Sequence, residues 1–131
     1  MALAAPLLAC SATGELAPRT VAPSANQHFI GVSVQPGPVR VVVTVPTLTV
    51  HGQNHVIFWD LHNAAGQSYR FAADGIAFKT PAGRSQFTCR RLTDARFQCL
   101  DQGTVAGTFE YGVKVEDATA TLFLDPLVVN N

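Results

Sequence analysis

Alternation of apolar and polar residues is the dominant pattern of this chain from Phe29 onward. The clearest example is residues 104–116, in which every second position from Phe109 is apolar and the intervening positions are mostly polar. Residues 56–62 alternate in the same way and place Trp59 on the apolar side. A period of two is typical of strands with one buried face. We therefore predict antiparallel strands here, with Trp59 as a core residue.

Further strands are predicted wherever short runs rich in Val, Ile, Thr and aromatic residues lie between turn residues. These runs are residues 29–35, 39–50, 68–71, 76–80 and 118–124. Turns are predicted at residues 36–38, 63–67, 72–75 and 81–83, and Pro46 predicts an edge position, a bulge or a break in its strand. With eight or nine strands and no substantial helix, we expect an all-β fold. The favoured architecture is a single antiparallel two-sheet sandwich, immunoglobulin-like or cupredoxin-like, with a small barrel as the second choice.

Residues 87–99 predict a β-hairpin that turns at Thr93-Asp94-Ala95 and carries two of the three cysteines. The expected register pairs Leu92 with Arg96, Arg90 with Gln98, and Cys89 with Cys99. Opposed Cβ atoms lie roughly 4.5–5.5 Å apart and a disulfide needs roughly 3.5–4.5 Å, so Cys89 and Cys99 can join with little strain. We predict this disulfide, which indicates an oxidising compartment.

The N-terminal region differs from the rest of the chain. Leu7-Leu8-Ala9-Cys10 resembles a bacterial lipobox, although no Lys or Arg precedes it and the apolar run is short for a signal sequence. Three interpretations stay open: lipidation of Cys10, a truncated cleavable signal, or an incidental cysteine. Residues 11–28 show no periodicity, which is typical of a disordered tether. The expected organisation is thus 1–10 signal or lipobox remnant, 11–28 tether and 29–131 β-sandwich.

Composition narrows the classes of function. The 131 residues suffice for one domain. Nine basic residues balance nine acidic residues, so no net field attracts nucleic acid or an anionic membrane. No apolar run approaches the roughly 20 residues that cross a bilayer. Any membrane association is therefore expected to depend on lipid at Cys10, and the protein is expected to be exported: periplasmic, tethered to the outer membrane or extracellular.

Candidate chemistry is sparse. A blue-copper site needs two His, a Cys thiolate and usually a Met, but Met1 is the only methionine and two cysteines are expected to be oxidised. His51 and His55 flank a loop containing Gly52 and are candidate ligands for Zn or Cu, with His28 or Asp60 as a further ligand. The chain has no Gly-x-Ser-x-Gly and no phosphate-binding loop, and its acids lie mostly in turns. No enzyme activity and no cofactor are predicted.

Arginines gather in the predicted hairpin. Arg84, Arg90 and Arg96 are expected on the face opposite the cysteines. Residues 84–100 hold four Arg and one Asp, a charge of +3, whereas residues 101–131 hold five acids and one Lys, a charge of −4. The arginine face is either neutralised by the neighbouring acidic strands, or it binds a protein partner or a second copy of the chain.

The function expected from sequence is a non-enzymatic, exported binding or assembly module of a bacterial envelope. Its arginines are the expected protein-binding residues, and loops 51–55, 63–67 and 72–75 are the expected ligand-binding positions. The alternatives are a periplasmic protein that binds Zn or Cu through loop histidines, and a small secreted inhibitor of a hydrolase.

Overall fold

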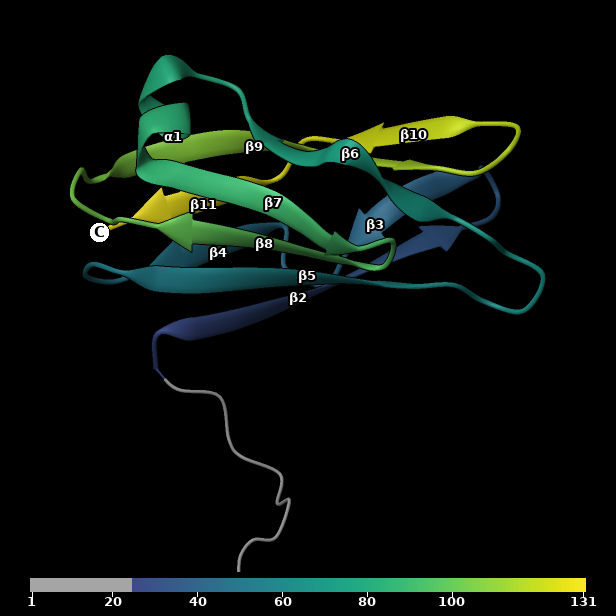
Figure 1. Cartoon of the computed structure of the whole chain (residues 1–131), viewed down its shortest axis with the longest axis horizontal. Helices are drawn as coiled ribbons and strands as arrows, with labels where there is room; N and C mark the ends of the chain where they lie inside the picture. The colour runs from purple at the N-terminus through teal and green to yellow at the C-terminus, as the bar shows by residue number, and fades with distance from the viewer. Residues whose placement is uncertain (1–24) are drawn as a thin grey trace, which may run out of the picture.

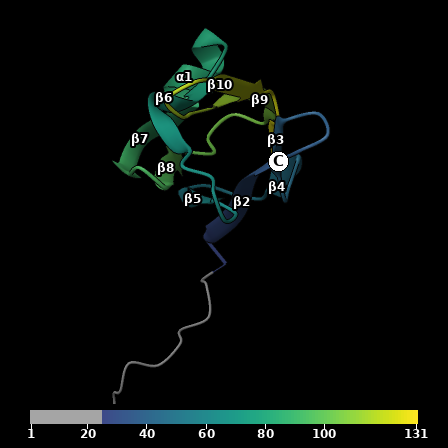
Figure 2. The ribbon, with the colours of Figure 1, turned by 90° about the vertical axis from the view of Figure 1, so that its right-hand side faces the viewer.

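Residues 25–131 are described by the computed structural model, and they form ten strands and one short helix (Figure 1). The first sheet has the order β3 (Arg40–Val43), β2 (Gln27–Gln35), β5 (His55–His62), β8 (Arg96–Asp101) and β7 (Phe87–Thr93). The second sheet has the order β10 (Thr121–Leu124), β9 (Gly107–Glu116), β11 (Leu127–Asn130) and β4 (Thr47–Val50), and β6 (Arg70–Phe78) also pairs with β9. Figure 2 shows β2 and β5 across the core from β9 and β10.

An all-β, two-sheet architecture is therefore confirmed, but the prediction of a purely antiparallel sandwich is wrong. β2 pairs with β5 in parallel, and β4 pairs with β11 in parallel. The cause lies at Pro46, where the predicted strand 39–50 breaks into β3 in the first sheet and β4 in the second. Because the chain crosses between the sheets there, β5 returns beside β2 in the same direction.

The core confirms the faces predicted from alternation. Trp59 is completely buried, and so are the apolar residues of β9 at positions 111, 113 and 115. The Trp59 Nε1–H donates a hydrogen bond of 3.1 Å to the Tyr111 hydroxyl, which ties the first sheet to the second. Burial raises the pKa of Tyr111 to about 12. This phenol therefore stays protonated across the physiological pH range.

Two segments depart from the predicted turns. Residues 72–75 lie inside β6, whose pairing with β9 is irregular between Phe71 and Ile76. Residues Pro81–Gln86 form the helix α1 instead of a turn. Pro81 lies in its first turn and Thr80 caps it, since the Thr80 hydroxyl accepts a hydrogen bond from the Gly83 N–H.

The N-terminal boundary lies slightly earlier than predicted, because β2 begins at Gln27. Residues 1–24 lie outside the described part of the chain, and with them Cys10, the lipobox-like sequence and most of the expected tether. Within residues 25–131, no helix is long and apolar enough to cross a membrane.

Gly103 offers a direct check of how the loops pack. Its φ is +65°, and a Cβ there would collide with the backbone of Gly52 and lie 3.1 Å from Gln53 Cα. We expect Gly103→Ala to destabilise the domain by about 1–3 kcal/mol, because the left-handed conformation and the close loop contact both disfavour a side chain. Denaturant unfolding measures this loss. Gly66→Ala is the matched control, since Gly66 also has positive φ but no atom of the described residues lies within 4 Å of its Cβ position.

Candidate functional site

The outer surface of the first sheet carries the most unusual set of side chains. The registers place Phe29 beside Phe58, Phe58 beside Gln98, and Gln98 beside Arg90, in one row across four strands. The alternate residues of β2, β5 and β8 are buried, so this row faces outward. We call this surface the arginine–phenylalanine face; it consists of Phe29, Phe58, Arg90, Arg96, Gln98 and Leu100.

Arg96 is held in place at the start of β8 by an ion pair and an aromatic contact. Its Nε donates to Asp60 Oδ1 at 2.8 Å and its Nη2 donates to Asp60 Oδ2 at 3.3 Å. The guanidinium also lies 4.4 Å from the centroid of the Phe58 ring. Phe58 in turn stacks on Phe29, with ring centroids 5.2 Å apart. The two-point ion pair and the cation–π contact hold the aromatic pair in a defined position.

Arg90 is the free charge of the face. Its Nε donates a long hydrogen bond of 3.4 Å to Gln98 Oε1, and no carboxylate in residues 25–131 lies within ion-pair distance of it. Phe29 and Leu100 on the same face are 44% and 47% exposed. The face therefore combines an uncompensated cation with accessible apolar groups.

The hairpin confirms most of the predicted register and corrects the placement of one arginine. Cys89 pairs with Cys99 in a disulfide, and Arg90 pairs with Gln98. Arg96 is opposite Thr93 rather than Leu92, because the strands shift register after Arg91. Arg84 lies on α1, since residues 81–86 turn into a helix instead of extending β7. Arg84 is therefore not on the arginine–phenylalanine face.

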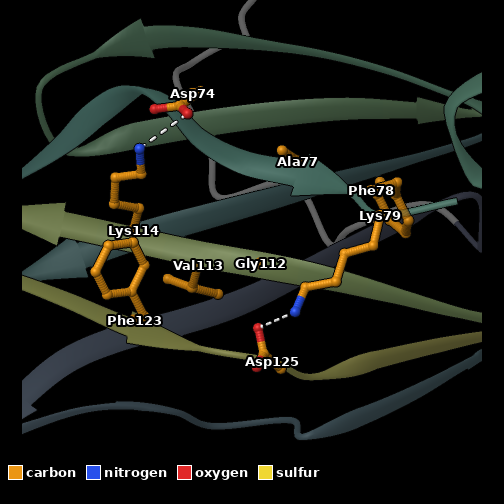
Figure 3. Close-up of a pocket in the computed structure, with 9 residues that line it drawn as sticks. All are labelled: Asp74, Ala77, Phe78, Lys79, Gly112, Val113, Lys114, Phe123 and Asp125. Atoms are coloured by element: carbon orange, nitrogen blue, oxygen red, sulfur yellow. Dashed lines mark hydrogen bonds and ion pairs between the residues drawn. The ribbon is translucent and has the colours of Figure 1, made fainter.

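The acidic residues at positions 74, 110, 116 and 125 pair with basic residues on or next to the second sheet. They line or adjoin a groove of about 340 Å³ across β6, β9 and β10 (Figure 3). Lys79 Nζ lies 2.6 Å from Asp125 and 3.8 Å from Glu110, and Lys114 Nζ lies 2.9 Å from Asp74. The lysines thus neutralise this acidic surface, and Arg90 does not.

The histidines meet in a different combination from the predicted one. His55 Nε2 lies 2.8 Å from the backbone carbonyl oxygen of His51, and His55 Nδ1 lies 3.0 Å from His28 Nε2. A carbonyl oxygen only accepts, so His55 carries its proton on Nε2 and its Nδ1 accepts from the His28 Nε2–H. His51 thus contributes its backbone, and the paired imidazoles are those of His28 and His55. In the described range 25–131, no three His, Cys, Asp or Glu side chains come together as a metal site.

His28 provides a pH test of this arrangement. Burial, with a smaller contribution from repulsion by His55, lowers the pKa of His28 from its usual value of 6.5. A lowered pKa means that the folded state disfavours the proton, so stability is present above pH 6.5 and is lost as the pH falls through the folded pKa. We expect the wild type to lose more stability than His28→Gln between about pH 7.5 and about pH 5. Denaturant unfolding across this range measures it, and parallel curves would contradict it.

A buried polar cluster that sequence reasoning missed lies at the same end of the sandwich as His55, which pairs with Asp101. Asp101 and Asn130 are each 1% exposed. Asp101 Oδ1 accepts from the Gly103 N–H at 3.0 Å and from Asn130 Nδ2 at 2.9 Å, while Asp101 Oδ2 and Asn130 Oδ1 find no hydrogen-bond partner among residues 25–131. Burial raises the pKa of Asp101. The sequence assigned Asp101 to a turn, although its spacing from Phe97 and Cys99 already placed it on the inward side.

Of the three segments predicted to hold a ligand, residues 72–75 contribute Asp74 to the groove of the second sheet, and loop 51–55 borders a second pocket. This pocket of about 310 Å³ is lined by Asn54, His55, Val56, Thr88, Leu100, Asp101 and Gln102. Leu100 belongs to both the pocket and the arginine–phenylalanine face. Gln67 of loop 63–67 donates to the Val34 carbonyl, and residues 72–75 belong to β6.

No known protein family matches this chain, and no curated protein matches it. The features of the molecule that bear on its function are therefore the arginine–phenylalanine face and the end of the sandwich where His28 meets His55.

Proposed function

We propose that this chain is a non-enzymatic, exported binding module whose arginine–phenylalanine face takes an extended, acidic and apolar segment of a protein partner. The observation that supports this most directly is Arg90, an uncompensated cation beside the exposed Phe29 and Leu100. Export is supported by the Cys89–Cys99 disulfide, which persists in oxidising compartments.

The composition of the face suits binding. Arginine and aromatic residues are enriched at protein interfaces and dominate their energetics. The Asp60 ion pair and the Phe58 contact already immobilise Arg96, so little side-chain freedom is left to lose when a partner docks. Arg90 then supplies the charge that selects a carboxylate, since Arg binds a carboxylate through two parallel hydrogen bonds.

The charge distribution favours a distinct partner over a second copy of the chain. The carboxylates at positions 74, 110, 116 and 125 already contact Lys or Arg of the second sheet. Asp117 Oδ1 accepts hydrogen bonds from the Thr119 and Ala120 N–H groups. Head-to-tail stacking through the second sheet would have to break these contacts before one of its acids could reach Arg90.

Selection of peptides from a random display library tests the proposal. We expect enriched peptides in which Asp or Glu alternates with Leu, Phe or Tyr. Their affinity, measured by fluorescence anisotropy, should fall at least about tenfold with Arg90→Glu or Phe29→Ala. It should also fall as salt is raised, since screening weakens an exposed ion pair.

Arg84→Glu is the matched control, because it makes the same charge change on α1, away from the face. It should leave the affinity within about twofold of the wild type. Selected peptides that bind wild type, Arg90→Glu and Phe29→Ala equally would contradict the proposal. An equal loss of affinity in Arg84→Glu and Arg90→Glu would also contradict it, because the loss would then follow from the net charge of the protein and not from the position of Arg90.

A further inference from the structure

We infer that His28 and His55 together form a binding site for one divalent copper ion, chelated by His28 Nε2 and His55 Nδ1. These nitrogens lie 3.0 Å apart and come from adjacent parallel strands. The predicted site used His51 and His55 with His28 or Asp60 as a further ligand; the proposed site keeps His55 and His28 and does not use the His51 imidazole. It is also independent of the arginine–phenylalanine face.

The hydrogen bond at His55 Nε2 fixes the tautomer of the ring so that Nδ1 can bind a metal. His55 Nε2 donates to the His51 carbonyl oxygen, so the unprotonated Nδ1 directs its lone pair toward His28, from which it accepts a hydrogen bond. Histidines that bind metals almost always donate their other ring N–H to a carbonyl or a carboxylate. The loop that places this carbonyl contains Gly52 and Asn54, both with positive φ. The local backbone thus holds His55 in the tautomer that a metal requires.

The nitrogen separation suits chelation of one ion, and the affinity order of divalent metals favours copper over zinc. With metal–nitrogen bonds of about 2.0–2.1 Å, two nitrogens lie about 2.9 Å apart at a right angle and about 3.3 Å apart at a tetrahedral angle. The observed separation of 3.0 Å lies between these two values, so one ion can reach both nitrogens after a small rearrangement of the rings. Cu²⁺ is also the strongest binder in the divalent series.

Binding of the metal to this pair needs only a shift of one proton within the His28 ring. His28 moves its proton from Nε2 to Nδ1, and the metal takes the Nε2 lone pair, so a neutral pair of imidazoles releases no proton. His55 is 6% exposed and supplies a fixed ligand, whereas His28 is only partly buried. Because no third side chain of metal-binding type joins them within residues 25–131, water completes the coordination.

Titration of the full chain with Cu²⁺ alone, followed by electron paramagnetic resonance, tests the inference. We expect one ion per chain, with a spectrum showing two equatorial imidazole nitrogens. Affinity should fall at least about tenfold with His28→Ala. It should stay within about twofold of the wild type with His51→Ala, because His51 acts through its backbone carbonyl, and with His62→Ala, an exposed residue of the same strand.

Three results would overturn the inference: unchanged affinity in His28→Ala, a tenfold loss in His51→Ala, or a wild-type spectrum without two imidazole nitrogens. The fluorescence of the buried Trp59 checks that each variant is folded. If His28→Ala does not fold, the spectrum of the wild type decides alone. Zn²⁺ titrated in parallel should bind more weakly than Cu²⁺, and tighter Zn²⁺ binding would contradict the choice of metal.

Discussion

Trp59→Ala is expected to destabilise the domain by about 3–5 kcal/mol, a large part of the total stability of a small domain. Trp59 is completely buried, packs edge-on against Tyr111 with ring centroids 5.2 Å apart, and donates its indole hydrogen bond there. Truncation opens a cavity between the sheets and removes that hydrogen bond. Denaturant unfolding measures the loss. It is followed by far-ultraviolet circular dichroism, because Trp59 is the only tryptophan and the variant has no tryptophan fluorescence to follow.

Tyr111→Phe separates the hydrogen bond from the packing. It keeps the ring but removes the hydroxyl, so the Trp59 N–H stays buried without an acceptor, which costs about 1–3 kcal/mol. We therefore expect Tyr111→Phe to lie between the wild type and Trp59→Ala. A loss below about 1 kcal/mol in Trp59→Ala would mean that the two sheets do not depend on this contact for their packing.

Removal of the disulfide is expected to have the next largest effect. The double variant Cys89→Ala, Cys99→Ala opens a link between residues ten positions apart. The unfolded chain then gains conformational freedom worth about 2.5–3 kcal/mol in the loop-entropy account. Denaturant unfolding of this variant and of reduced wild type should give midpoints lowered to a similar extent. Midpoints equal to that of oxidised wild type would contradict the prediction.

The same disulfide supports the proposed binding face. It joins β7 and β8, the strands that carry Arg90 and Arg96. Loosening this hairpin should raise the ordering cost of binding. Selected peptides should therefore bind the double variant more weakly than oxidised wild type, even at temperatures where both are folded. Unchanged affinity would show that the strand pairing of β8 with β5 is sufficient to fix the face.

Sequence reasoning succeeded where structure is local. Alternation located the buried faces of β5 and β9, and hairpin geometry paired Cys89 with Cys99. It failed on α1, because Pro81 and Gly83 are turn residues as well as residues that a capped first helical turn accepts. It also failed on the parallel pairs, since the alternation within a strand has no information about the direction of its neighbour.

The candidate sites depend on those parallel contacts. Phe29 meets Phe58, and His28 meets His55, only because β2 runs parallel to β5 in one register. The hairpin itself predicted Arg90 and Arg96 as neighbours on one face. The aromatic partners of Arg96 and the imidazole partner of His55 came from distant parts of the chain, which sequence periodicity does not connect.

The arginine–phenylalanine face is tested most directly by amide chemical shifts of the isotope-labelled chain, titrated with a selected acidic peptide. Binding there should shift the amides of β2, β5 and β8 around Phe29, Phe58 and Gln98, and these shifts should vanish in Arg90→Glu. Shifts centred instead on the groove of β6, β9 and β10, where Phe123 is 67% exposed, would contradict the proposed face and move the binding site to the second sheet.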